Sequence, residues 1–244
     1  MSRPSNVENA FHALALEEHR APFTATLWNL PYGGTTKLVQ CWFPGVHISV
    51  GGGDNARPKV GGDQLAEITY AWMFDMCQPF LEFDSDTEQR RRNRHDIMDE
   101  DTKQPGWGLG IVDDSYRWYH RPAFQAVRTP GQYNPTTFNT SDVDYVAHGS
   151  QEYIHACVRI RLDLNLTINA MRGFERVADP DVGKYVLRSG WKWVKKLHNG
   201  QTVEIPEMRI LGDAKSAERS LISAKSRDIV NMGTIVRETP SLLD

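Results

Sequence analysis

Apolar residues near the start of the chain recur three and four positions apart, from Val7 onward. That spacing matches one face of a helix, so the pattern predicts a helix over residues 6–20. Ser5, followed three residues later by Glu8, is a capping-box signature for the first turn of this helix. Residues 22–36 contain proline and paired glycines and are predicted as a loop.

Residues 38–43 are apolar except for Gln40, and this run predicts a strand. His47 follows the end of this strand and is itself followed by three glycines, Gly51–Gly53. Because glycine has no β-carbon, backbone or ligand can approach closely there. Helical spacing of apolar residues then predicts a helix over 63–78.

Four later segments have weaker signals. Residues 82–103 mix acidic and basic side chains, which is typical of a solvated helix or mobile loop. Residues 105–140 are rich in Pro, Gly, Asn and Thr and are predicted as irregular surface structure. Residues 152–164 are interpreted as a helical turn running into a strand, and residues 213–230 as a short surface helix.

Asn199-Gly200 is the strongest short hairpin signal in the chain. It lies between residues 185–197 and 201–211, which are predicted to pair as an appended β element. Trp191 and Trp193 in its first strand are predicted to pack against the main body, with carbohydrate binding as the alternative.

The order helix, strand, histidine loop and helix is typical of an α/β repeat. The chain is therefore assigned to the α/β class, with part of an open sheet and an added hairpin. Four segments are predicted. A core portion spans residues 1–82 and a charged segment spans 83–104. An irregular segment spans 105–165, and an appendage with a hairpin and a short helix spans 166–244.

Composition narrows the functional classes. The net charge is −3 over 244 residues, which gives no electrostatic basis for nucleic-acid binding, and acidic residues flank the basic run Arg90–Arg94. The three cysteines, Cys41, Cys77 and Cys157, are far apart, as expected of reduced thiols in the cytoplasm. Potential metal ligands are not clustered, so no metal site is expected, and no cofactor is expected either. The chain lacks a long apolar run, so neither a signal peptide nor a transmembrane segment is expected.

His47 is the candidate catalytic residue. In hydrolase triads the imidazole lies at a strand end, where one nitrogen faces the nucleophile and the other faces an acid. The remaining histidines offer less. His12 and His19 are predicted to be packed or solvated on the first helix, and three others lie in irregular segments without ligand spacing and are unassigned: His120, His148 and His155.

The segment Val39–Gly53, which includes Trp42-Phe43-Pro44-Gly45-Val46-His47, resembles the catalytic-histidine motif of the α/β-hydrolase family of type VI secretion phospholipase effectors. His12–Arg20 and Ile68–Met73 are similar to segments before and after that motif in the family. Arg128–Tyr133 and Glu152–His155 resemble segments of uncharacterised fungal relatives. The resemblance covers roughly residues 5–162.

This resemblance implies a Ser–Asp–His esterase or phospholipase mechanism in which His47 deprotonates the serine. Family members often carry Asp where this chain has Ser49, and Asp54 is a possible substitute. In α/β hydrolases the nucleophile and acid precede the histidine, yet no Gly-x-Ser-x-Gly occurs in the chain. Glu17 and Glu18 are assigned to the first helix and not to the triad. We therefore expect the C-terminal part of a hydrolase, without nucleophile or acid and inactive alone.

Two hypotheses follow. In the first, the chain is a phospholipase-like hydrolase portion that acts on a lipid or small ester once a missing N-terminal half completes it. In the second, it is a non-enzymatic binding module that associates through an exposed sheet edge, with a partner or with a second copy.

Overall fold

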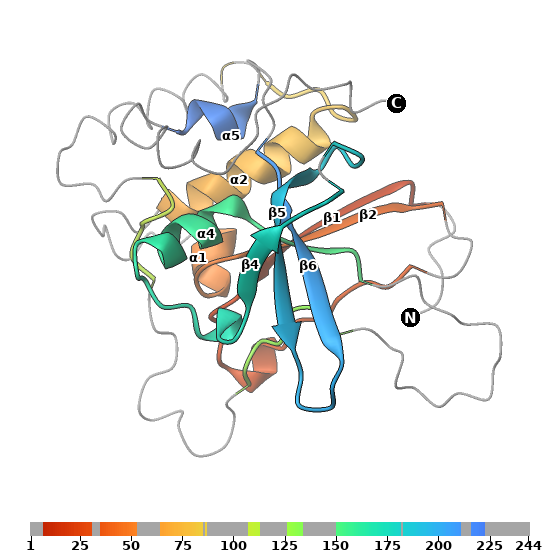
Figure 1. The fold of residues 1–244 in the computed structure, drawn as a ribbon. Coiled ribbons are helices and arrows are strands. Elements are labelled where there is room, and N and C mark those ends of the chain that lie inside the picture. Colours follow the sequence, from red (N-terminus) through yellow and green to blue (C-terminus); the bar gives the residue numbers. More distant parts are fainter. Residues whose placement is uncertain are drawn as a thin grey trace.

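The computed structural model describes residues 7–30, 35–52, 64–84, 86, 107–112, 126–133, 150–181, 183–210 and 216–222. Its centre is a six-stranded mixed sheet with the strand order β1-β2-β3-β6-β5-β4 (Figure 1). The strands are β1 Asn9–Ala15, β2 Lys37–Phe43, β3 Glu152–Ile154, β4 Glu175–Ala178, β5 Arg188–Lys196 and β6 Thr202–Met208. The α-helices are α1 His47–Gly51, α2 Gln64–Cys77, α4 Ala156–Asp163 and α5 Ala217–Ser220, and two short 3-10 turns span Ala21–Phe23 and Asn169–Met171.

The first half of the sheet is parallel. β1 pairs with β2 from Asn9↔Lys37 to Ala15↔Phe43, and β2 continues to β3 and β6 in parallel pairings. β6, β5 and β4 are antiparallel. Since parallel neighbours run in the same direction, β1 and β2 end together, and the residues that follow them meet at one edge of the sheet.

Both faces of the sheet are covered by apolar side chains. On one face Phe43 contacts Trp72 of α2 with ring centroids 5.4 Å apart, and α5 packs beside α2 (Figure 1). On the other face Trp42 and Leu14 belong to a second cluster that includes Trp193 of β5. This double coverage is usual for the parallel part of a sheet.

The predicted helix over residues 6–20 is wrong, because β1 occupies residues 9–15. Phe11, Ala13 and Ala15 pack toward the α2 face, whereas Leu14 and Leu16 pack toward the other. When both faces of a strand are packed, apolar residues occur at neighbouring positions. Such a run also contains apolar residues at the i, i+3 and i+4 spacing of a helix, so the two structures are hard to distinguish. Ser5, the expected cap, lies outside the described residues.

The strand at 38–43 and the helix at 63–78 are confirmed, as β2 and α2. The order predicted for residues 152–164 is reversed, since strand β3 comes first and helix α4 follows. The described parts of 105–140, residues 107–112 and 126–133, contain neither helix nor strand. Of the charged segment, only residues 82–84 and 86 are described.

The hairpin around Asn199-Gly200 is confirmed, but it is not an appendage. β6 pairs with β3, so β5 and β6 extend the central sheet. A hairpin signal is local and does not specify which other strand it will join. Helix α5 lies inside the range 213–230, yet Ala217 and Glu218 are buried, which corrects the expected surface position.

Candidate functional site

His47 is the first residue of α1 and follows the turn at the end of β2. The turn depends on Gly45, which has φ +102°, a conformation that side-chain-bearing residues rarely adopt. The His47 side chain is 44% exposed, so its ring is fixed at its base and open to solvent. The histidine loop of the sequence interpretation is therefore the start of a short helix, and Gly51 ends that helix.

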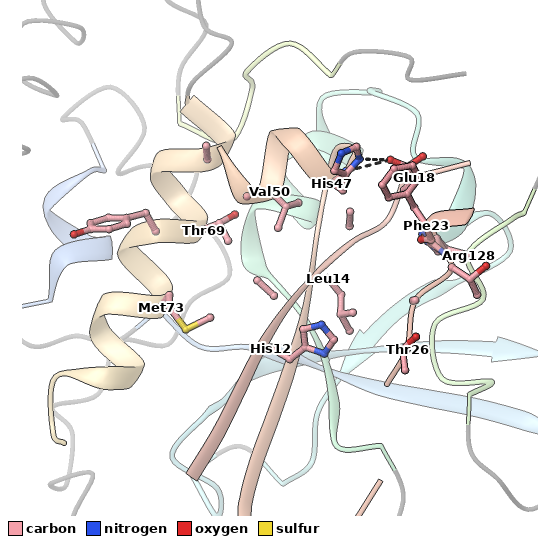
Figure 2. A pocket seen from close by; sticks show the side chains of 17 residues that line it. His12, Leu14, Glu18, Phe23, Thr26, His47, Val50, Thr69, Met73 and Arg128 are labelled. Carbon is pink, nitrogen blue, oxygen red and sulfur yellow. Dashed lines mark hydrogen bonds and ion pairs between the residues drawn. The ribbon is translucent and has the colours of Figure 1, made fainter. Parts of the chain in front are cut away.

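Glu18 is the partner of this histidine. It follows β1, is fully buried, and places Oε2 2.6 Å from His47 Nδ1 (Figure 2). The two residues are brought together because β1 and β2 are parallel neighbours that end at the same edge. The assignment of Glu18 to a helix, without a role beside the histidine, is wrong.

Arg20 holds the Glu18 carboxylate in place. Its Nε and Nη2 donate to Oε1 and Oε2 at 3.0 and 3.1 Å, and its backbone N–H donates to Oε1 at 3.0 Å. Burial pushes the pKa of Glu18 upward, but the hydrogen bonds from Arg20 and His47 outweigh it and lower the pKa to about 2. The residue is therefore a carboxylate at neutral pH.

A carboxylate at Nδ1 determines the proton positions on His47. A carboxylate only accepts hydrogen bonds, so Nδ1 carries the proton and donates to Glu18. Arg20 Nη2 also lies 2.9 Å from Nδ1, because both groups converge on the same carboxylate. In neutral imidazole the other nitrogen, Nε2, is then the one with a free lone pair, which is the state a general base requires.

Phe23 packs on the flat face of the imidazole. The ring centroids are 4.6 Å apart and the planes differ by 13°. Arg20 also contacts the Phe23 ring, with Cζ 4.2 Å from its centroid. Phe23 thus limits rotation of the His47 ring while remaining 45% exposed itself.

A pocket of about 570 Å³ opens beside this group. Its lining includes His47 and Glu18 at one end, β1 residues along its base, and residues of α2 and of the segment 23–26 at its sides (Figure 2). Most of the lining side chains are small or apolar, which suits an apolar ligand next to a polar end.

The structure places the other sequence candidates elsewhere. His12 also lines the pocket, but its Nδ1 is 3.2 Å from Gln40 Oε1. His19 is partly buried and follows β1, not a helix. Ser49 is buried beneath Gly45. Asp54, His120 and His148 lie outside the described residues.

His155 has partners that the sequence analysis missed. It is fully buried, with Nδ1 2.9 Å from Cys157 Sγ and Nε2 2.5 Å from Glu218 Oε1. Burial disfavours its charged form, but Cys157 and Glu218 raise the pKa to about 10. Glu218 is 63 residues away along the chain, so spacing alone could not pair it with His155.

For Glu18 a sequence signal did exist. Residues 12–16 contain no glycine or proline and lead directly into two acids, which is also the pattern of a buried strand followed by polar edge residues. Among the described residues, no group of three or more His, Cys, Asp or Glu could hold a metal. None of the described helices is long and apolar enough to cross a membrane.

Comparison with known protein families gives a match over the N-terminal part of the chain. Residues 1–76 match the family model described as T6SS, phospholipase effector Tle1-like, catalytic domain. This range contains both Glu18 and His47 and supports the family suggested by the histidine motif. No curated protein and no solved structure matches the chain significantly.

Proposed function

We propose that the residues around His47 form the base end of a serine-hydrolase-type site for carboxylic esters of the phospholipid class. The observation that carries this proposal is the 2.6 Å contact between Glu18 Oε2 and His47 Nδ1, beside an imidazole ring that is open to solvent. The match of residues 1–76 to a phospholipase effector catalytic domain agrees with it.

In this proposal His47 Nε2 accepts the proton of an attacking hydroxyl and later that of a water molecule. Glu18 is a positioning residue. It fixes the tautomer through Nδ1 and stabilises the imidazolium that forms when Nε2 takes up the proton. Glu18 thus has the role that the sequence interpretation assigned to an acid outside the chain.

The nucleophile is proposed to come from outside the described residues. Among these residues the polar contacts of the His47 ring are with Glu18 and Arg20, both at Nδ1. Thr24 and Thr69 in the pocket donate to the backbone carbonyls of Ala21 and Leu65. The 244 residues contain no Gly-x-Ser-x-Gly elbow. We therefore expect this chain alone to hydrolyse phospholipids negligibly, since loss of a triad serine leaves only weak residual catalysis.

The test uses an activated ester, because the free nitrogen of a neutral imidazole attacks its acyl carbon and expels p-nitrophenolate without a serine, and water then hydrolyses the acyl-imidazole. Hydrolysis of p-nitrophenyl acetate by the purified chain is expected to fall in His47→Ala and, less, in Glu18→Gln. His198→Ala is the control, because His198 is exposed in the turn between β5 and β6. If His47→Ala hydrolyses the ester as fast as His198→Ala, the proposed base is wrong. If the unmodified chain hydrolyses phosphatidylcholine vesicles at an enzymatic rate, the proposed external nucleophile is wrong.

A second candidate is a non-enzymatic binding module. One observation favours it: among the described strands, β1 is at an edge of the sheet and pairs on one side only. An edge strand presents a row of backbone N–H and C=O groups that can pair with another chain. The ester assay separates the two candidates, since a binding module needs no reactive His47.

A further inference from the structure

The pocket beside His47 is a groove that extends along β1, which has no strand partner on this side among the described residues. Its lining includes four successive residues of that strand, His12 to Ala15. Successive side chains of a strand point to opposite faces, so they line the same cavity only where the cavity runs along the strand edge. Figure 2 shows β1 at the base of this groove, with Met73 and Thr69 of α2 on one side and Thr26 on the other.

Backbone groups of β1 face this groove without a partner among the described residues. Lys37 N–H donates to Glu8 O and Leu16 N–H donates to Phe43 O, so the even-numbered residues point toward β2. The direction alternates along a strand, so the N–H and C=O groups of Phe11, Ala13 and Ala15 point toward the groove. These residues are half-buried, so their unpaired groups are partly withdrawn from water.

We propose that this groove binds an extended segment of another polypeptide, which adds to the sheet as a strand beside β1. An acyl chain would fill the apolar space but could not satisfy the backbone donors and acceptors of β1, whereas a strand satisfies both. A second copy of the chain is disfavoured, because the side chains of α2 and of residues 23–26 line the groove on both sides of its own β1 edge.

The lining indicates the chemistry of the partner. Side chains of the added strand that point toward α2 would meet Ala66, Thr69, Tyr70 and Met73, and those are expected to be apolar. Small residues, including Ala13, leave room for the incoming backbone. Arg128 also lines the groove and is 4% exposed, and its Nε has no partner in the described structure although Nη2 donates to Phe23 O. A carbonyl or carboxylate of the bound segment is the expected acceptor for this Nε.

The test starts from a library of displayed linear decapeptides selected on the full 244-residue chain. The affinity of enriched peptides is then measured by fluorescence polarisation on the unmodified chain and on Ala13→Pro. Proline at position 13 removes an N–H that points into the groove and leaves the pairing of β1 with β2 intact. We expect the affinity to fall at least tenfold, and the amide of Ala13 to become protected from hydrogen exchange when peptide binds to the unmodified chain.

Ala178→Pro is the matched control. Ala178 lies on β4, the strand at the opposite edge, and Asp179 N–H donates to Gly190 O, so the N–H of Ala178 points away from β5. This variant is expected to keep the peptide affinity. Peptides methylated on alternate amide nitrogens give a second readout, which does not depend on the folding of Ala13→Pro, and one of the two methylation patterns is expected to abolish binding.

Three results with peptides would overturn the proposal: no peptide is enriched, enriched peptides bind Ala13→Pro as tightly as the control, or neither methylation pattern weakens binding. Equal binding of cis-parinaric acid to both proline variants, without competition by peptide, would identify the groove as an acyl site instead. None of these measurements depends on ester turnover, so failure here is distinct from failure of the proposed chemistry.

Discussion

The Glu18 carboxylate and the His47 imidazole are 2.6 Å apart, although 28 residues separate them along the chain. They meet because each follows one of two parallel neighbouring strands. Glu18 is buried and bound by Arg20, whereas the His47 ring is open to solvent. The buried Glu18 carboxylate therefore orients the solvent-accessible imidazole of His47. Four predictions follow from this pair and from other contacts in the structure.

Acid should weaken the fold through Glu18. Its pKa is lowered from 4.5 to about 2, so between these values the unfolded chain binds more protons than the folded chain. Stability from this residue is complete above pH 4.5 and is lost as the pH falls toward 2. Urea unfolding at pH 6 and pH 3 should show a larger loss for the unmodified chain than for Glu18→Gln. An equal loss in both would contradict this role. At pH 6 the substitution itself should cost about 1–3 kcal/mol, because hydrogen-bond donors lose a charged acceptor.

Phe23 should determine the magnetic environment of the His47 ring. With near-parallel rings 4.6 Å apart, the imidazole protons lie over an aromatic face. In Phe23→Ala the His47 ring resonances should move downfield in the ¹H–¹³C spectrum. Phe80→Ala is the control, since Phe80 is equally exposed but stacks on Phe11. Unchanged His47 resonances in Phe23→Ala would mean that the stack does not form in solution.

Gly45→Ala should destabilise the turn that precedes His47. The added Cβ would lie 2.7 Å from Ser49 Cβ, at a φ of +102°. Gly200 has a φ of +84° with nothing within 4 Å, so Gly200→Ala isolates the backbone cost. The free energy of unfolding should fall by about 1 kcal/mol in Gly200→Ala. In Gly45→Ala it should fall further, by up to about 3 kcal/mol. Equal costs in denaturant unfolding would show that Ser49 moves aside freely.

The buried pair of His155 and Glu218 should be sensitive to truncation and to alkaline pH. Glu218→Ala leaves a buried imidazole without its carboxylate and should cost about 3–5 kcal/mol. The pKa of His155 is raised from 6.5 to about 10, so its stabilisation is complete below pH 6.5 and is lost as the pH rises toward 10. Unfolding at pH 7 and pH 9.5 should therefore show a decline that is smaller in Glu218→Ala, where only Cys157 still raises the pKa of His155. A parallel decline in both proteins would exclude the pair as its source.

Local patterns were sufficient for several elements. The apolar run before His47 predicted β2, the helical spacing and the following proline predicted α2, and Asn199-Gly200 predicted the β5–β6 hairpin. Each of these signals arises from residues close together in the chain. The histidine motif also pointed to the family whose model matches residues 1–76.

The same patterns gave wrong predictions for strands that are packed on both faces, because such strands do not alternate between polar and apolar residues. β1 was predicted as a helix, because its two polar residues, Asn9 and His12, are three positions apart and apolar residues occupy both faces of the strand, so no period of two is visible. This error also placed Glu18 on a helix and hid it from His47. The reversed order of β3 and α4 has a similar origin, since residues 152–160 are almost continuously buried and periodicity cannot separate a strand from a helix.

The amino-acid sequence by itself determined that a histidine follows a buried strand and precedes glycines, and that a hairpin forms around Asn199-Gly200. Only the tertiary structure decided which carboxylate faces that histidine, that the hairpin joins the central sheet, and that the edge of β1 borders a groove. These three features depend on which strands are neighbours and in which direction they run. Strand neighbours are chosen by burial over the whole sheet, so no local stretch of sequence specifies them.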